Sequence, residues 1–168
     1  MSLTARMESW QILLHIAATL EWDVQQIDIK MAFLYRLLPD DEVQYMEQPE
    51  DFLEPRKETW VWRLQQALYG MKQAGQIWNR MMNNAMISWG FTPLGVEPCI
   101  YYHLLPSGTN IAAIHVDNFL SIASLKEENE LFKKDMQKKW IISDLGDVSF
   151  CIGITIQQDH THKTISLS

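Results

Sequence analysis

The chain has 168 residues, of which 47% are apolar, so it is long enough to bury the core of one folded domain. Its formal net charge of −7 argues against a free-standing nucleic-acid binder, because such proteins draw much of their affinity from Lys and Arg contacts to phosphates. The sequence has no apolar run near the ~20 residues of a membrane-spanning helix and no signal peptide, so a soluble, intracellular protein is expected. Cys99 and Cys151 lack metal-ligand spacing and are expected to be free, buried thiols.

Hydrophobic periodicity predicts helices and strands in alternation along the chain. The expected helices span residues 4–22, 74–89 and 126–140. Strands are expected around residue 28 and at residues 43–48, 60–64, 100–104, 111–114, 150–157 and 164–168, with a hairpin over residues 111–122. This order predicts an α+β fold in which one antiparallel sheet has its helices packed on one face.

The stretch 111–122 consists of two Ile- and Val-rich runs that meet at Asp117 and Asn118. This pattern is typical of a β-hairpin, and the two polar residues, which tolerate positive φ, are expected at its tip. A carboxylate in such apolar surroundings costs free energy unless a partner such as a divalent cation compensates it.

A second acid, Asp28, lies in a strand-like segment far away in the sequence. Two strands that each carry an Asp suit a two-metal nucleotidyl-transfer centre, in which Mg²⁺ takes oxygen ligands. On spacing alone, a pair of ordinary strand-end acids is the simpler interpretation, because Asp is common at such positions.

Five short segments strengthen the functional interpretation. They are residues 26–34 (QIDIKMAFL), 45–49 (YMEQP), 68–74 (LYGMKQA), 115–118 (HVDN) and 144–154 (DLGDVSFCIGI). In this order they resemble the reverse transcriptases of copia-type LTR retrotransposons (Pseudoviridae). The resemblance covers nearly all of residues 1–168. It implies a polymerase palm with a ferredoxin-like antiparallel sheet and part of the fingers, the rest of the fingers and the thumb being largely missing.

The resemblance also implies an activity and its partners. An RNA-directed DNA polymerase adds dNTPs to a primer 3′-hydroxyl on an RNA or DNA template. In a retrotransposon particle it would act in the cytoplasm or nucleus. The resemblance makes Asp28 and Asp117 ligands of Mg²⁺ or Mn²⁺, with the Ile29 carbonyl as an extra oxygen, and puts Asn118 at the position of a second catalytic acid.

Other site residues follow from the same resemblance. Phe33 matches an aromatic gate against the ribose 2′-hydroxyl, although from the residues alone a Phe packed in the core is an equal alternative. A nucleotide-binding and template-binding segment is implied at Tyr69, Gly70, Lys72 and Gln73, for which a strand-to-helix turn with a solvated Lys is the alternative. A primer grip is implied at Cys151, Ile152 and Gly153.

Several positions depart from the family pattern. Asn118 replaces an acid, Tyr35 and Arg36 replace Asn-Gly, Asp51 replaces Gly, and Gly75 and Gln76 replace Pro-Arg. A neutral amide binds a divalent ion less well than a carboxylate does, so we expect weak or no activity. A non-catalytic, retrotransposon-derived relic that acts as an interaction module, or has no function, is the alternative.

The Lys-rich run at residues 133–139 is a further candidate contact for nucleic acid. Its two interpretations are a phosphate-tracking surface and an ordinary solvated helix face. The sequence does not distinguish a monomer from an oligomer.

Overall fold

The computed structural model describes residues 4–35, 38, 43–68, 70–71, 74–151, 153–159 and 164–167. Its α-helices are α1 (Met7–Leu20), α2 (Ala74–Ser88) and α3 (Lys126–Gln137), and its 3-10 helices are η1 (Ala32–Tyr35) and η2 (Glu50–Phe52). The strands are β1 (Asp23–Ile29), β2 (Gln44–Glu47), β3 (Val61–Leu64), β4 (Thr92–Leu94), β5 (Glu97–Leu104), β6 (Thr109–His115), β7 (Asn118–Ala123), β8 (Ile142–Asp147), β9 (Phe150–Cys151), β10 (Ile154–Asp159) and β11 (Thr164–Leu167).

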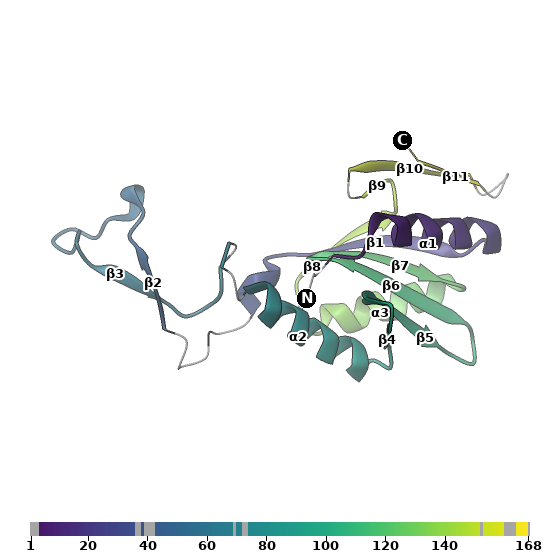
Figure 1. Cartoon of the computed structure of the whole chain (residues 1–168), viewed down its shortest axis with the longest axis horizontal. Coiled ribbons are helices and arrows are strands. Elements are labelled where there is room, and N and C mark those ends of the chain that lie inside the picture. Colours follow the sequence, from purple (N-terminus) through teal and green to yellow (C-terminus); the bar gives the residue numbers. More distant parts are fainter. Residues whose placement is uncertain are drawn as a thin grey trace.

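A six-stranded sheet forms the centre of the molecule (Figure 1). Its strand order is β4-β5-β6-β7-β1-β8, and every neighbouring pair is antiparallel. β1 and β7 lie in the interior of this sheet and are buried along most of their length. Strands β6 and β7 contribute side chains to core clusters on both faces of the sheet, which explains why residues 111–122 contain so few polar residues.

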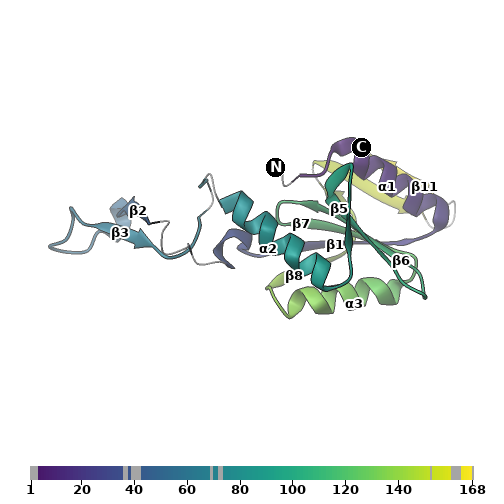
Figure 2. The ribbon, with the colours of Figure 1, turned by 60° about the horizontal axis from the view of Figure 1, so that its bottom comes forward.

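Helices cover both faces of the sheet. On one face, α2 and α3 pack through Trp78 and Phe132 against Ile27 and Phe119. On the other face, α1 packs its own apolar stripe in a second core cluster, which includes Val24, Leu120 and Ile122. Figure 2 shows α1 and α3 on opposite sides of the strands. The prediction that the helices share one face is therefore wrong, because the apolar residues on the second face of β1 and β7 require a cover of their own.

The C-terminal strands β9, β10 and β11 form a separate three-stranded antiparallel sheet beside α1. This sheet contributes Cys151 and Ile156 to the α1 cluster, which also contains Cys99. Both cysteines are buried thiols that form no disulfide, as predicted. None of the described helices is long and apolar enough to cross a membrane.

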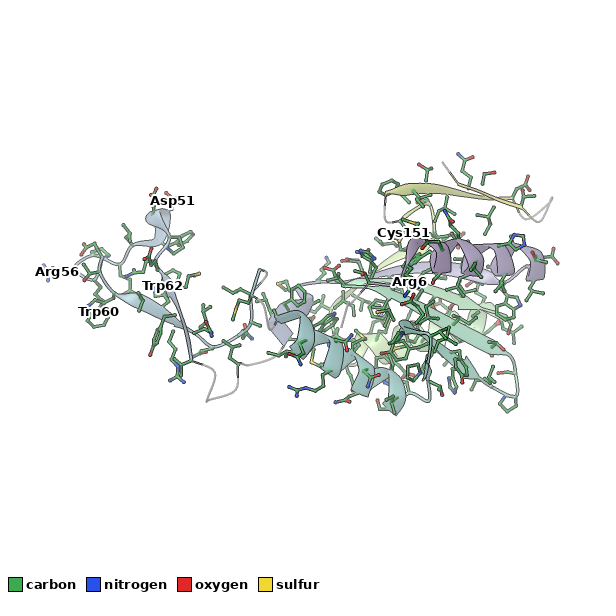
Figure 3. All side chains as sticks on the ribbon, viewed as in Figure 1. Arg6, Asp51, Arg56, Trp60, Trp62 and Cys151 are labelled. Carbon is green, nitrogen blue, oxygen red and sulfur yellow. The ribbon has the colours of Figure 1, made fainter. Side chains whose placement is uncertain are left out.

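Strands β2 and β3 form a hairpin that projects away from the main sheet (Figures 1 and 3). The loop between them is organised by the buried Gln48, whose amide donates to the carbonyls of Lys57 (2.6 Å) and Trp60 (2.9 Å). The Gln48 amide oxygen accepts from the Glu54 backbone N–H at 2.8 Å. The Gln of the YMEQP segment thus has a structural role, since one side chain satisfies three backbone groups of the loop.

Candidate active site

The acid Asp28 lies in a row of four residues that crosses the sheet. It pairs with Asn118 of β7 on one side and with Ser143 of β8 on the other, and Asn118 pairs in turn with His115 of β6. Residues directly opposite each other in antiparallel strands point to the same face. The neighbours of Asp28 on β1 point into the α2–α3 core, so the row belongs to the face on which α1 packs.

The second acid, Asp117, lies in the turn between β6 and β7. This turn consists of Val116 and Asp117, and Val116 has a left-handed φ of 61°. The prediction that Asp117 and Asn118 form the tip is therefore wrong by one residue, because Asn118 already belongs to β7. A β-branched residue with positive φ is strained, and glycine is usual at the first position of such two-residue turns.

Two hydrogen bonds hold the strained turn in place. The buried indole of Trp78 donates its Nε1–H to the Val116 carbonyl at 2.7 Å. The backbone N–H of Ile29 donates to the Asp117 carbonyl at 2.9 Å. Helix α2 and strand β1 therefore fix the turn that carries Asp117 beside the end of the strand that carries Asp28.

The carboxylate of Asp117 is close enough to Asp28 to affect its ionisation. Burial raises the pKa of Asp28 above its ordinary value, the negative charge of Asp117 raises this pKa further, and Lys30 partly opposes both. The side-chain amide of Asn118 donates to Asp117 Oδ1 at 3.2 Å, which offsets part of the negative charge of Asp117.

This pair of acids fits a divalent cation electrostatically, because a cation would offset the repulsion from Asp117 that adds to burial in raising the pKa of Asp28. Its protein ligand set is small: within the residues that the structure describes, no three His, Cys, Asp or Glu side chains gather where they could hold a metal ion. The available oxygens are those of Asp28 and Asp117, the Asn118 amide oxygen and the Ile29 carbonyl. Such a site would rely on water and substrate phosphate for its remaining ligands, as Mg²⁺ sites commonly do.

We expect Asp28→Asn to raise the melting temperature slightly at pH 7 in the absence of divalent metal. An acid whose pKa is raised on folding binds its proton more tightly in the folded state, so its ionisation destabilises the fold at every pH above the raised pKa. The gain should disappear well below pH 3.8, the ordinary pKa, where Asp28 is protonated in both states.

Thermal unfolding with a chelator at pH 7 and at low pH measures this effect. The matched control is Asp51→Asn, which removes an exposed carboxylate from the β2–β3 hairpin (Figure 3). A lower melting temperature for Asp28→Asn than for the unmodified chain at pH 7 would contradict the prediction.

Phe33 lies in η1, five residues after Asp28, and is half-buried. Its ring packs against the α2–α3 core and against a smaller cluster that includes Ala67 and Ile77. The ring of Phe33 therefore makes contacts with the core and also stays partly exposed.

The other predicted contacts for nucleotide, template and primer are only partly covered by the structure. Gly70 has a φ of 90° in open surroundings, and Gly153 has a φ of 78° in the turn between β9 and β10, so both need the conformational freedom of glycine. The thiol of Cys151 is buried in the α1 cluster, so a primer contact there could use only backbone groups. Four predicted residues lie outside the described part of the chain: Tyr69, Lys72, Gln73 and Ile152.

Lys133 is not on a solvated helix face, although the neighbouring Lys134, Lys138 and Lys139 are exposed. Its side chain is 5% exposed, and its ammonium group contacts Gln25 Oε1 (2.9 Å), Asp144 Oδ2 (2.9 Å) and Glu130 Oε1 (3.1 Å).

Burial alone would lower the pKa of Lys133, but its hydrogen bonds to Asp144 and Glu130 outweigh burial, and the pKa is raised. Lys133 therefore ties β1 to β8 next to the Asp28–Ser143 pair. Sequence reasoning missed this role and the positions of His115 and Ser143, because they depend on the pairing of distant elements. It also missed the hydrogen bond from Trp78 to Val116, which depends on how α2 packs against the sheet.

The antiparallel sheet, with an acid at the end of a central strand and another in the adjoining turn, is consistent with a reverse transcriptase domain. The entire chain, residues 1–168, matches the family model described as reverse transcriptase (RNA-dependent DNA polymerase). The chain belongs to this family, and its curated relatives identify it as a reverse transcriptase domain of the copia type.

The relatives are proteins of retrotransposons. The chain is 32% identical over 164 residues to the retrovirus-related Pol polyprotein from transposon TNT 1-94 of Nicotiana tabacum, covering 97% of this chain and 12% of the relative. It is 32% identical to the putative transposon Ty5-1 protein YCL074W of Saccharomyces cerevisiae, covering 84% of this chain and 45% of the relative. It is 27% identical to the retrovirus-related Pol polyprotein from transposon RE1 of Arabidopsis thaliana, covering 94% of this chain and 11% of the relative. The chain spans less than half the length of each, and no solved structure matches it.

Proposed function

We propose that this chain carries the palm, with part of the fingers, of an RNA-directed DNA polymerase that adds dNTPs to a primer 3′-hydroxyl. The observation that carries the proposal is the proximity of Asp28 and Asp117, which come from distant parts of the chain. The N–H of Ile29, next to Asp28, donates to the Asp117 carbonyl at 2.9 Å, and the charge of Asp117 adds to burial in raising the pKa of Asp28. The family match supports nucleic acid and dNTPs as the partners. The retrotransposon relatives support action within a retrotransposon particle, in the cytoplasm or nucleus.

In this proposal, the carboxylates of Asp28 and Asp117 bind Mg²⁺ or Mn²⁺, with the Ile29 carbonyl as a further oxygen ligand. The bound ions supply the Lewis acidity that lowers the pKa of a primer hydroxyl and balances charge on the leaving pyrophosphate. The turn at Val116 and Asp117 fixes one carboxylate, and pairing of β1 with β7 and β8 fixes the other. Phe33 contacts the deoxyribose and excludes a 2′-hydroxyl, and the segments at residues 69–73 and 151–153 contact template, nucleotide and primer.

Asn118 makes the proposed activity weak. An Asp at this position would add a negative charge opposite Asp28, whereas Asn supplies a neutral amide whose N–H already donates to Asp117. The site is left with two carboxylates, and its affinity for a divalent ion is reduced accordingly.

Primer extension on an RNA template and on a DNA template, with Mg²⁺ or Mn²⁺, tests the proposed function. We expect slow incorporation that Asp28→Asn abolishes and that the control Asp51→Asn leaves unchanged. Incorporation that persists in Asp28→Asn would show that the two-acid site is not responsible. No incorporation with either ion would favour the non-catalytic relic instead.

A further inference from the structure

The backbone of Ile141, between α3 and β8, is held by two groups from the segment that follows Asp28. Its carbonyl accepts from the Lys30 backbone N–H at 3.0 Å, and its N–H donates to the phenolic oxygen of Tyr35 at 2.5 Å. Residues 30–35 are thus attached at their first and last positions to Ile141, the residue immediately before β8. Together the two hydrogen bonds close a loop of the chain that contains η1.

The turn inside this closed loop carries Phe33. It starts at Met31, which has a left-handed φ of 54°, and continues with a hydrogen bond from the Leu34 N–H to the Met31 carbonyl at 2.8 Å. Ala32 is 1% exposed and anchors one side of the turn in the core. A single 3-10 turn with a strained first residue is not stable on its own, so its position depends on such external contacts.

The other side of the turn is loosely packed. An open cavity of about 360 Å³ borders it, lined by Met31, Leu34, Tyr35, Gln66 and Ile141. Tyr35 packs partly against the α2–α3 core, but the side of η1 that faces Ile141 borders this cavity and has room to move, so packing alone does not fix it. The hydrogen bond between Tyr35 and Ile141 spans 106 residues of sequence and supplies the missing constraint.

We propose that Tyr35 is a positioning residue that holds η1 against Ile141, the residue before β8, and so fixes the ring of Phe33 relative to Asp28. The step from Phe33 to selection of deoxynucleotides rests on the proposed function, whereas the mechanical role of Tyr35 does not. Tyr35 stands where the resembling family has Asn. Its phenol accepts from the backbone N–H of Ile141, just before β8, so this departure contributes a specific contact near the site rather than only the loss of a family residue.

Amide hydrogen exchange in the intact chain tests the mechanical role. Tyr35→Phe removes only the phenolic oxygen, and we expect exchange at Ile141 and at Leu34 to accelerate about fivefold, the worth of one ordinary hydrogen bond. Amides of β6 and β7 should keep their exchange rates, and Tyr45→Phe, which removes an exposed phenol on the β2–β3 hairpin, should change neither Ile141 nor Leu34. Unchanged exchange at Leu34 in Tyr35→Phe would overturn the proposal, as would equal acceleration across the whole sheet.

A second readout addresses nucleotide selection. In primer extension, Tyr35→Phe should lower the preference for a dNTP over the matching rNTP a fewfold, with a smaller effect on incorporation of the dNTP itself. An unchanged preference alongside faster exchange at Leu34 would overturn the link between η1 and sugar selection. If the unmodified chain incorporates no nucleotide, the proposed function fails, and the exchange experiment still decides whether Tyr35 positions η1.

Discussion

Asn118→Asp should raise Mg²⁺-dependent primer extension by about tenfold or more, because it adds a carboxylate to a proposed metal site that has only two. The same substitution should lower the stability of the metal-free chain. Asn118 lies directly opposite Asp28 and donates to Asp117 at 3.2 Å, so an Asp there replaces a hydrogen bond with repulsion from both acids. A gain in activity combined with a loss of stability is the expected signature of an added metal ligand.

Initial rates of dNTP incorporation and thermal unfolding with a chelator measure the two effects. Asn84→Asp adds the same charge on an exposed part of α2 and serves as the matched control. The prediction is contradicted if Asn118→Asp and Asn84→Asp extend the primer equally, because the missing charge at residue 118 would then not limit the reaction.

Lys133→Met should lower the free energy of unfolding by about 2–3 kcal/mol. This loss is smaller than that for breaking a fully buried ion pair, because the Asp144 side chain is 43% exposed and its carboxylate can regain water. Most of the loss would come from Gln25, which is 3% exposed and would lose the partner of its amide oxygen. For a chain of 168 residues this corresponds to a fall in melting temperature of about 5–10 °C.

Urea denaturation of Lys133→Met and Lys134→Met gives the comparison. Lys134 is the next residue of α3 and is exposed, so its substitution should change the free energy of unfolding by less than about 0.5 kcal/mol. Equal effects of the two substitutions would show that the contacts of Lys133 with β1 and β8 do not stabilise the fold.

Elements with a strong apolar period could be predicted from the sequence. The helix expected at residues 74–89 is α2 (Ala74–Ser88), since its apolar residues recur at helical spacing over four turns. Strand β8 was not predicted, because Asp144 and Asp147 suggest a polar loop. Their carboxylates instead accept from Lys133 and Gln25, which come from distant elements. Local pattern cannot show such partners.

The residues of the candidate site could be proposed from the sequence, but their geometry could not. Asp28 and Asp117 follow from the family segments and from the apolar runs around them. The turn shifted by one residue because local preference favours Asn over Val at positive φ, whereas hydrogen bonds from Trp78 and Ile29 hold Val116 and Asp117 in the turn. The placement of Asn118 directly opposite Asp28 depends on strand register, which is a property of the assembled sheet.

The central claim is that Asp28 and Asp117 together bind a divalent ion, and Mn²⁺ binding to the intact chain tests it without requiring catalysis. Electron paramagnetic resonance counts the free ion in titrations of the chain and of Asp28→Asn, Asp117→Asn and Asp51→Asn. We expect the unmodified chain and Asp51→Asn to bind one or more Mn²⁺ ions with similar affinity, and Asp28→Asn and Asp117→Asn each to lose about tenfold or more. Equal Mn²⁺ affinity in all four proteins would contradict the account.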